Sequence, residues 1–137
     1  MKTIPANTEN FIYENLNPNN HNNAGDCVIR AISKALNQPW KKTYQDLCEI
    51  GCRLGRMPND RVVFDRYLKS KGWTKCSEPR NWDNTKMTVE AFMRYTKDDV
   101  IIANVGSLHV TCIIDKKVYD KWNCTKKTMH TYYVEVK

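Results

Sequence analysis

The residue pattern changes near Asp99, and this change constrains the fold more than any other feature of the sequence. Upstream of it, apolar residues recur at helical spacing. Downstream, four strand-length segments are rich in β-branched and aromatic residues: DDVIIANV, SLHVTCII, KVYDKW and HTYYVEVK. Helices followed by a meander of antiparallel strands predict an α+β fold. The chain has 137 residues, which is the length of one domain over 1–137.

Caps and helix breakers delimit the helices that we expect upstream of the strands. The predicted helices cover residues 26–37, 39–54, 60–70 and 88–95. Residues 1–23 are rich in Asn and interrupted by Pro5 and Pro18, which predicts an irregular leader with a short strand over 10–13. Because the leader runs directly into the first helix, it must lie near the start of that helix.

The formal net charge of +7 favours an acidic partner such as nucleic acid. The basic residues are spread along the chain, however, so nucleic acid is only a weak expectation. No segment resembles a secretory signal or approaches the roughly 20 apolar residues of a membrane span. We therefore expect a soluble, cytoplasmic protein with no membrane partner, in which the six cysteines are reduced thiols.

Cys27 falls in the first turn of the first predicted helix. Asp26 is a preferred N-cap residue, and the unpaired N–H groups and positive dipole end of a helix start favour a thiolate. The helical wheel places Arg30 on the polar side, opposite a continuous apolar arc. Nucleophilic cysteines are commonly located at the N-terminus of a helix. A half-buried structural cysteine would give the same pattern, so this stretch alone leaves both interpretations open.

His109 begins the second predicted strand and shares a face with Thr111. A two-residue turn at 115–116 brings Asp120 opposite Thr111 and diagonal to His109, within roughly 7–8 Å. A three-residue turn would instead bring Asn123 opposite His109. Either residue could hold an imidazole in one tautomer. We favour Asp120, because its neighbours on the same strand face are apolar.

The order of Cys27, His109 and Asp120, on a helical half followed by a sheet, resembles the papain-like cysteine peptidase superfamily. The stretch DCVIRAI resembles the start of the central helix in small bacterial and phage members, and D-K-W at 120–122 is similar to the N-S-W of papain relatives. Asp as the third member is similar to C39-type peptidases, transglutaminases and arylamine acyltransferases. The resemblance covers 20–122 and implies a papain-like domain, whose Cys-bearing central helix packs on a C-terminal antiparallel sheet.

The resemblance implies a catalytic triad of Cys27, His109 and Asp120 that needs no metal or cofactor. The family usually places a glutamine six residues before the cysteine, as part of the oxyanion hole; here His21 stands at that position, followed by Asn22, and either side chain could donate. The implied function is a thiol protease or amidase that forms an acyl-enzyme on peptide or protein substrates. If an amine attacked the acyl-enzyme in place of water, the protein would be an acyltransferase. Because the chain is short for the family, a partner protein could complete the cleft.

Two interpretations in which Cys27 is not a nucleophile remain open. In the first, Cys27 and His109 are packing residues and the protein is a basic binding module, in which aromatic residues beside cations, as in Arg80-Asn81-Trp82, stack on bases. In the second, a zinc ion is bound by Cys48 and Cys52 together with Cys112, Cys124 or a histidine. Cysteines spaced as C-x3-C on a helix, without a second ligand pair, are not typical of zinc sites.

Overall fold

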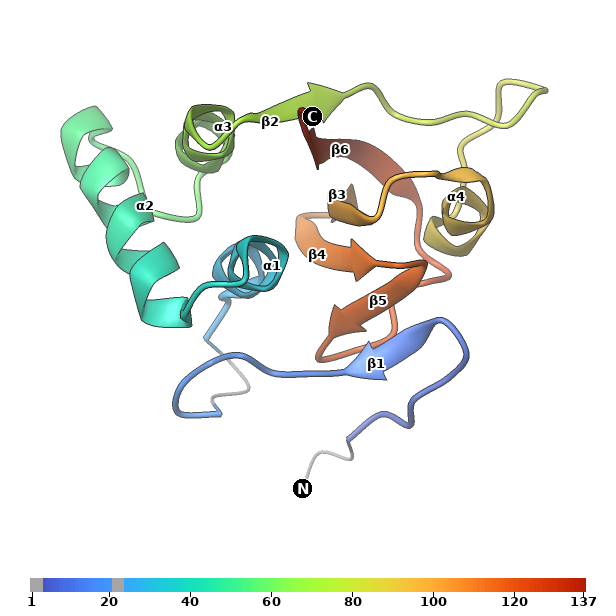
Figure 1. The fold of residues 1–137 in the computed structure, drawn as a ribbon, viewed down its shortest axis with the longest axis horizontal. Coiled ribbons are helices and arrows are strands. Elements are labelled where there is room, and N and C mark those ends of the chain that lie inside the picture. Colours follow the sequence, from blue (N-terminus) through green and yellow to red (C-terminus); the bar gives the residue numbers. More distant parts are fainter. Residues whose placement is uncertain (1–3, 21–23) are drawn as a thin grey trace.

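The structure, a computed structural model, describes residues 4–20 and 24–137, which form four helices and one six-stranded sheet (Figure 1). The helices are α1 (Cys27–Leu36), α2 (Trp40–Leu54), α3 (Arg61–Ser70) and α4 (Val89–Tyr95). The strands are β1 (Phe11–Tyr13), β2 (Trp73–Cys76), β3 (Val100–Val105), β4 (His109–Ile114), β5 (Lys117–Asp120) and β6 (Met129–Glu135). The predicted α+β class is confirmed. None of the helices in the described ranges is long and apolar enough to cross a membrane.

The strands β3, β4 and β5 form two consecutive antiparallel hairpins. The turn at 115–116 has two residues, both with positive φ, and it pairs Ile114 with Lys117. This is the register that a two-residue turn predicts. β6, however, pairs with β3 and not with β5, so the predicted meander ends at β5. The reason is that residues 121–128 carry the chain back across the sheet, while β1 occupies the outer edge of β5.

Two strands from the first two thirds of the chain complete the sheet, whose order is β1-β5-β4-β3-β6-β2. β1 pairs in parallel with β5, with Phe11 opposite Val118, and β2 pairs antiparallel with β6. The prediction of an antiparallel sheet is therefore right for the four C-terminal strands and wrong for the whole, which is mixed. The added strands satisfy backbone groups that β5 and β6 would otherwise leave unpaired at the edges.

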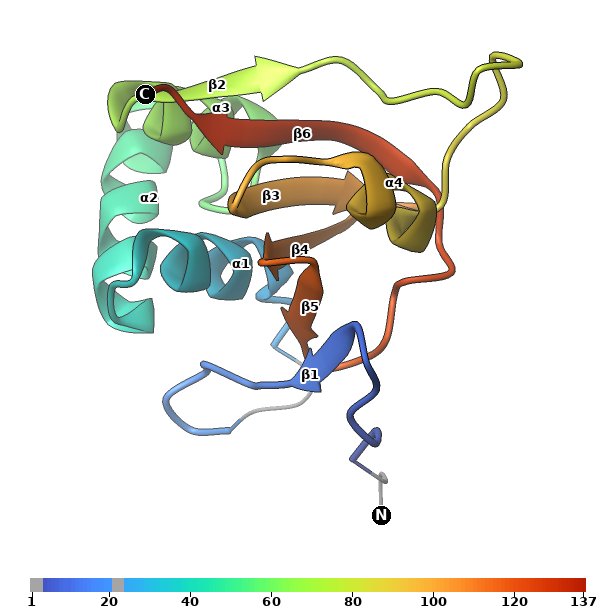
Figure 2. The same ribbon diagram turned by 45° about the vertical axis from the view of Figure 1, so that its right-hand side comes forward.

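Helices cover both faces of the sheet (Figures 1 and 2). A first core cluster joins α1, α2 and α3 to one face and includes Ile32, Leu47 and Leu68. A second core cluster, on the other face, includes Phe92 of α4 and Met129. β3 is buried over five of its six residues, as expected for a near-continuous apolar strand covered on both sides.

The polar side of α1 is buried against other elements, contrary to the helical-wheel prediction. Arg30 and Ser33 are both buried. The hydroxyl oxygen of Ser33 lies 2.6 Å from the Ile29 carbonyl oxygen and 2.7 Å from Thr43 Oγ1 of α2, within hydrogen-bond distance of both. The wheel treats polar residues as solvent-facing. Here α2 and β5 supply hydrogen-bonding partners on that side, so α1 is enclosed almost all round.

Candidate active site

Cys27 is the first residue of α1, as predicted, and Asp26 precedes it at the N-cap position. The carboxylate of Asp26 does not cap the helix, which corrects the expectation from its residue type. It is 3% exposed and accepts hydrogen bonds from Trp40 Nε1 at 2.9 Å and from Asn17 Nδ2 at 3.0 Å. The amide N–H groups of the first turn are therefore left for other partners.

His109 and Asp120 are joined by a direct hydrogen bond. His109 Nε2 lies 2.7 Å from Asp120 Oδ2, and the hydroxyl of Thr111 donates to the same oxygen at 2.6 Å. Both contacts follow from the hairpin register, which brings the end of β5 beside the first residues of β4. The ring of Trp122 packs on the imidazole, with centroids 4.7 Å apart. Asp120, only 2% exposed, is thus held in one position, and His109 is half-buried.

The thiol of Cys27 meets the same imidazole. Burial alone would raise the pKa of Cys27, but hydrogen bonds with His109 and with the Val110 backbone, and the positive charges of His109 and Arg30, hold it below its ordinary value. Burial would lower the pKa of His109, yet hydrogen bonds with Asp120, Cys124 and Cys27 and the charge of Asp120 raise it to about 11. Both shifts favour the thiolate–imidazolium pair over the neutral thiol–imidazole pair.

Arg30 connects the two carboxylates of the site, a role that sequence reasoning missed. Its Nε donates to Asp26 Oδ1 at 2.9 Å, and its Nη1 donates to Asp120 Oδ1 at 2.8 Å, with Arg30 itself 8% exposed. Burial would raise the pKa of Asp120, but hydrogen bonding and charge from His109, a hydrogen bond from Thr111 and the charge of Arg30 hold it below its usual range. The guanidinium also offsets the charge of Asp26 beside Cys27.

Cys124 is a further thiol at this site that the sequence singled out only as a candidate zinc ligand. It is buried, and its Sγ and the nearest ligand atoms of His109 and Asp120 lie within 4.8 Å of one another. Asp120 is not free to take a metal, since its oxygens already accept from Arg30, the Lys121 N–H, His109 and Thr111. A metal would have to replace those hydrogen bonds, so the donor set fits one poorly.

The zinc ligands considered from the sequence are not brought together within the described residues. Cys48 and Cys52 lie on α2, half-buried and exposed respectively. Cys112 is buried in the first core cluster and Cys124 in the second. All six cysteines are free thiols, as expected.

Asn123, the alternative orienting residue, does not bond the imidazole of His109. Asn123 is exposed, and its Oδ1 accepts from the backbone N–H and the hydroxyl of Thr125, at 3.0 and 2.6 Å. It therefore stabilises its own loop, and the orienting position belongs to Asp120. His21 and Asn22, the candidate oxyanion donors, lie outside the described residues.

A groove of about 420 Å³ lies beside the start of α1. Asp26 and Ile29 line it together with the stacked rings of Trp40 and Tyr44, whose centroids are 5.1 Å apart. Met57, exposed in the loop between α2 and α3, completes the rim. The groove thus offers apolar and aromatic surface next to the residue that precedes Cys27.

Comparison with protein-family models, with curated proteins and with solved structures gives no significant match. The geometry of the site itself therefore carries the functional inference.

Proposed function

We propose that the protein is a papain-like, cysteine-nucleophile hydrolase that cleaves peptide or amide bonds through an acyl-enzyme. One observation carries the proposal: a single imidazole, that of His109, is bonded to Asp120 at 2.7 Å and to the thiol of Cys27 at a helix start. A nucleophile joined to a base, with the base oriented by a third group, is the arrangement that activates a thiol for acyl transfer.

In the first half of the reaction, the Cys27 thiolate attacks the substrate carbonyl carbon and a C–S bond forms. The negative charge that develops on the carbonyl oxygen is accepted by the Cys27 N–H, one of the helix-start amides that have no intrahelical partner. The His109 imidazolium gives its proton to the departing amine nitrogen as the C–N bond breaks. The products are a thioester on Cys27, a free amine and a neutral imidazole.

In the second half, water attacks the thioester carbon while His109 takes one of its protons. The C–S bond breaks, the carboxylic acid product leaves, and the thiolate–imidazolium pair is restored. Because Nε2 of His109 is held by Asp120, Nδ1 is the nitrogen that serves the reacting atoms. Asp120 stays ionised throughout and stabilises the imidazolium.

Arg30 is a positioning residue in this proposal. It bonds the carboxylate that orients His109 and the carboxylate that precedes Cys27, so it ties the nucleophile-bearing helix to the end of β5. The groove beside α1 is the proposed binding surface for substrate side chains, and its stacked rings favour apolar or aromatic ones.

Labelling with a peptidyl vinyl sulfone, followed by intact-mass measurement and peptide mapping, tests the proposal. We expect one adduct, on Cys27, which is lost in Cys27→Ala and strongly slowed in His109→Ala. Cys52→Ala is the matched control, because Cys52 is the most exposed of the thiols and should keep the wild-type labelling rate. Labelling of Cys52 with Cys27 unmodified would contradict the proposal.

A further inference from the structure

Trp82 is the most exposed large apolar side chain in the described ranges, at 99% of its full accessible area. It belongs to the loop of residues 77–88 between β2 and α4, which projects beyond the sheet in Figures 1 and 2. A tryptophan in full contact with water contributes little to the folding of its own chain. Tyr95 lines the same groove as Trp82 and is also exposed, so the two rings form a shared exposed aromatic surface, which is typical of a binding site.

The tip of this loop is an ordered turn. Asn81 Nδ2 donates to Thr85 Oγ1 at 2.9 Å, and the Asn84 N–H donates to the Asn81 carbonyl at 2.8 Å. Asp83 Oδ1 accepts from the N–H and the hydroxyl of Thr85, at 3.1 and 2.6 Å. Trp82 is therefore presented on a structured support, which reduces the entropy lost when it binds.

A groove of about 470 Å³ separates Trp82 from α4, and we name it the aromatic groove. Tyr95, 71% exposed at the end of α4, forms its opposite rim. Phe92 and Tyr132 also line it, with ring centroids 4.8 Å apart. The groove thus has two water-exposed aromatic rims over an aromatic base.

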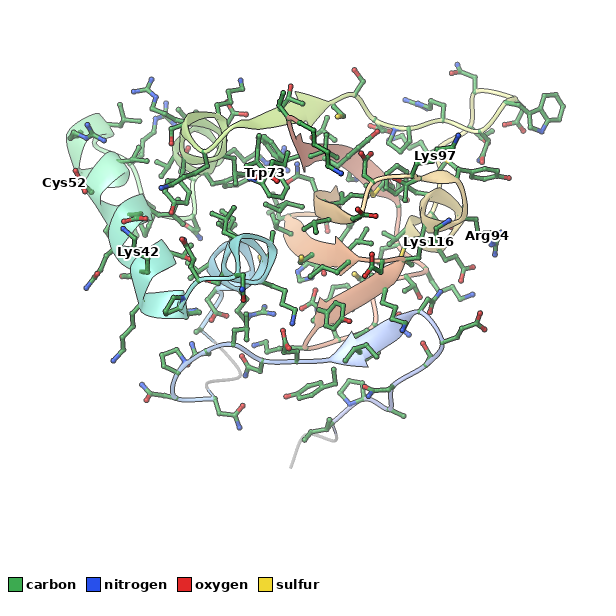
Figure 3. All side chains as sticks on the ribbon, viewed as in Figure 1. Lys42, Cys52, Trp73, Arg94, Lys97 and Lys116 are labelled. Atoms are coloured by element: carbon green, nitrogen blue, oxygen red, sulfur yellow. The ribbon has the colours of Figure 1, made fainter. Side chains whose placement is uncertain are left out.

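Cationic side chains accompany these rings. Arg80 and Lys97 line the aromatic groove, and Asp98 is the acidic residue in its lining. Figure 3 shows Lys97, Arg94 and Lys116 along the outer side of α4. Arg80 is paired with Glu78 at 3.5 Å, and the charge of Arg94 acts on Glu90 of the same helix. Lys97 forms no ion pair within the described part of the chain, so its charge is available to an anionic partner.

We propose that the aromatic groove binds single-stranded nucleic acid, with a base stacked on Trp82 and phosphates near Arg80 and Lys97. Exposed aromatic rings beside cations are the surface that such strands require, because every base has a π face and every linkage has a negative charge. The net charge of +7 supports the encounter. An acidic polypeptide would be attracted by the same cations, but it offers no regularly spaced flat rings for Trp82 and Tyr95.

The aromatic groove is separate from the site of Cys27 and His109, so the proposed nucleic-acid binding does not depend on the proposed hydrolase activity. Lys97 and Asp98 come just before the first residues of β3, whereas His109 pairs with Val105 at the other end of that strand. Cys27→Ala should therefore bind an oligonucleotide as the wild type does.

Fluorescence anisotropy with a labelled, mixed-sequence single-stranded DNA of about 16 nucleotides tests the proposal. Trp82→Ala should weaken binding roughly 5- to 150-fold, which corresponds to the loss of one stacked base. Trp82→Tyr keeps a stacking ring and should retain most of the affinity. Val62→Ala removes another exposed apolar side chain, on α3 and outside the lining of this groove, and should have no effect.

The salt dependence of binding tests the phosphate contact. Lys97→Ala should reduce the slope of log affinity against log salt by about 0.7, the value for one phosphate on a single strand. Lys41→Ala makes the same charge change on α2 and should leave the slope unaltered. The proposal is overturned if the wild type does not bind the oligonucleotide, if Trp82→Ala binds equally well, or if polyglutamate competes as strongly as unlabelled DNA.

Discussion

The start of α1 buries charged side chains, whereas the aromatic groove leaves aromatic side chains exposed to water. At the start of α1, Arg30, Asp26 and Asp120 are buried together and paired with one another. At the groove, Trp82 and Tyr95 remain exposed although burial would favour them. Burying charged groups costs free energy, and aromatic surface that stays in water contributes little to folding. Stability alone therefore explains neither arrangement. The first arrangement is the basis of the proposed hydrolase activity, and the second is the basis of the proposed nucleic-acid binding.

The largest effect that we predict concerns the buried charges. Arg30→Met leaves the carboxylates of Asp26 and Asp120 buried without their guanidinium, and it should lower the free energy of unfolding by about 3–5 kcal/mol. Lys34→Met is the matched control on the same helix. The Lys34–Glu14 pair has side chains 26% and 29% exposed, so its loss should cost less than about 1 kcal/mol. Urea denaturation of both variants measures the difference, and equal losses would show that the buried network contributes no more than a surface pair.

A smaller difference is expected between two tryptophans. Trp122 packs on the ring of His109 and is half-buried, so Trp122→Ala should cost about 2 kcal/mol, less than the ~3–5 kcal/mol of a fully buried aromatic residue. Trp82→Ala should change stability by no more than about 0.5 kcal/mol, because its side chain is exposed. Thermal melting of the two variants compares them. Similar melting temperatures would show that Trp122 contributes no more to stability than Trp82 does.

The smallest predicted effect is on the ionisation of His109. Asp120→Asn removes the negative charge that favours the imidazolium, so the His109 pKa should fall from about 11 and alkylation of Cys27 near pH 7 should slow. Asn123→Ala should leave both nearly unchanged, because Asn123 bonds Thr125. NMR titration of the ring protons follows the pKa in each variant. A response to Asn123→Ala alone would transfer the orienting role to that residue.

Local patterns were sufficient to predict much of the fold and the candidate site. The two-residue turn at 115–116 fixes the hairpin register, and that register alone brings Asp120 to His109. The cap residues Asp60 and Thr88 also mark real helix starts, where their side chains accept from Val62 and Ala91. Each of these features depends on residues close in the sequence.

Features that depend on distant residues were not predictable in this way. Arg30 is buried because Asp120, 90 residues later, supplies a carboxylate. A helical wheel contains no information about such a partner. The parallel pairing of β1 with β5, the return of β6 to β3 and the position of Cys124 beside His109 likewise depend on contacts between distant parts of the chain.

The central claim is that Cys27 exists as a thiolate paired with His109 at neutral pH. The rate of iodoacetamide alkylation, followed cysteine by cysteine between about pH 6 and about pH 8, tests it most directly. Hydrogen bonding and charge from His109 lower the Cys27 pKa, so its rate should already be high at the lower pH and change little. A Cys27 rate that starts low at the lower pH and rises steeply toward the higher one would contradict the account.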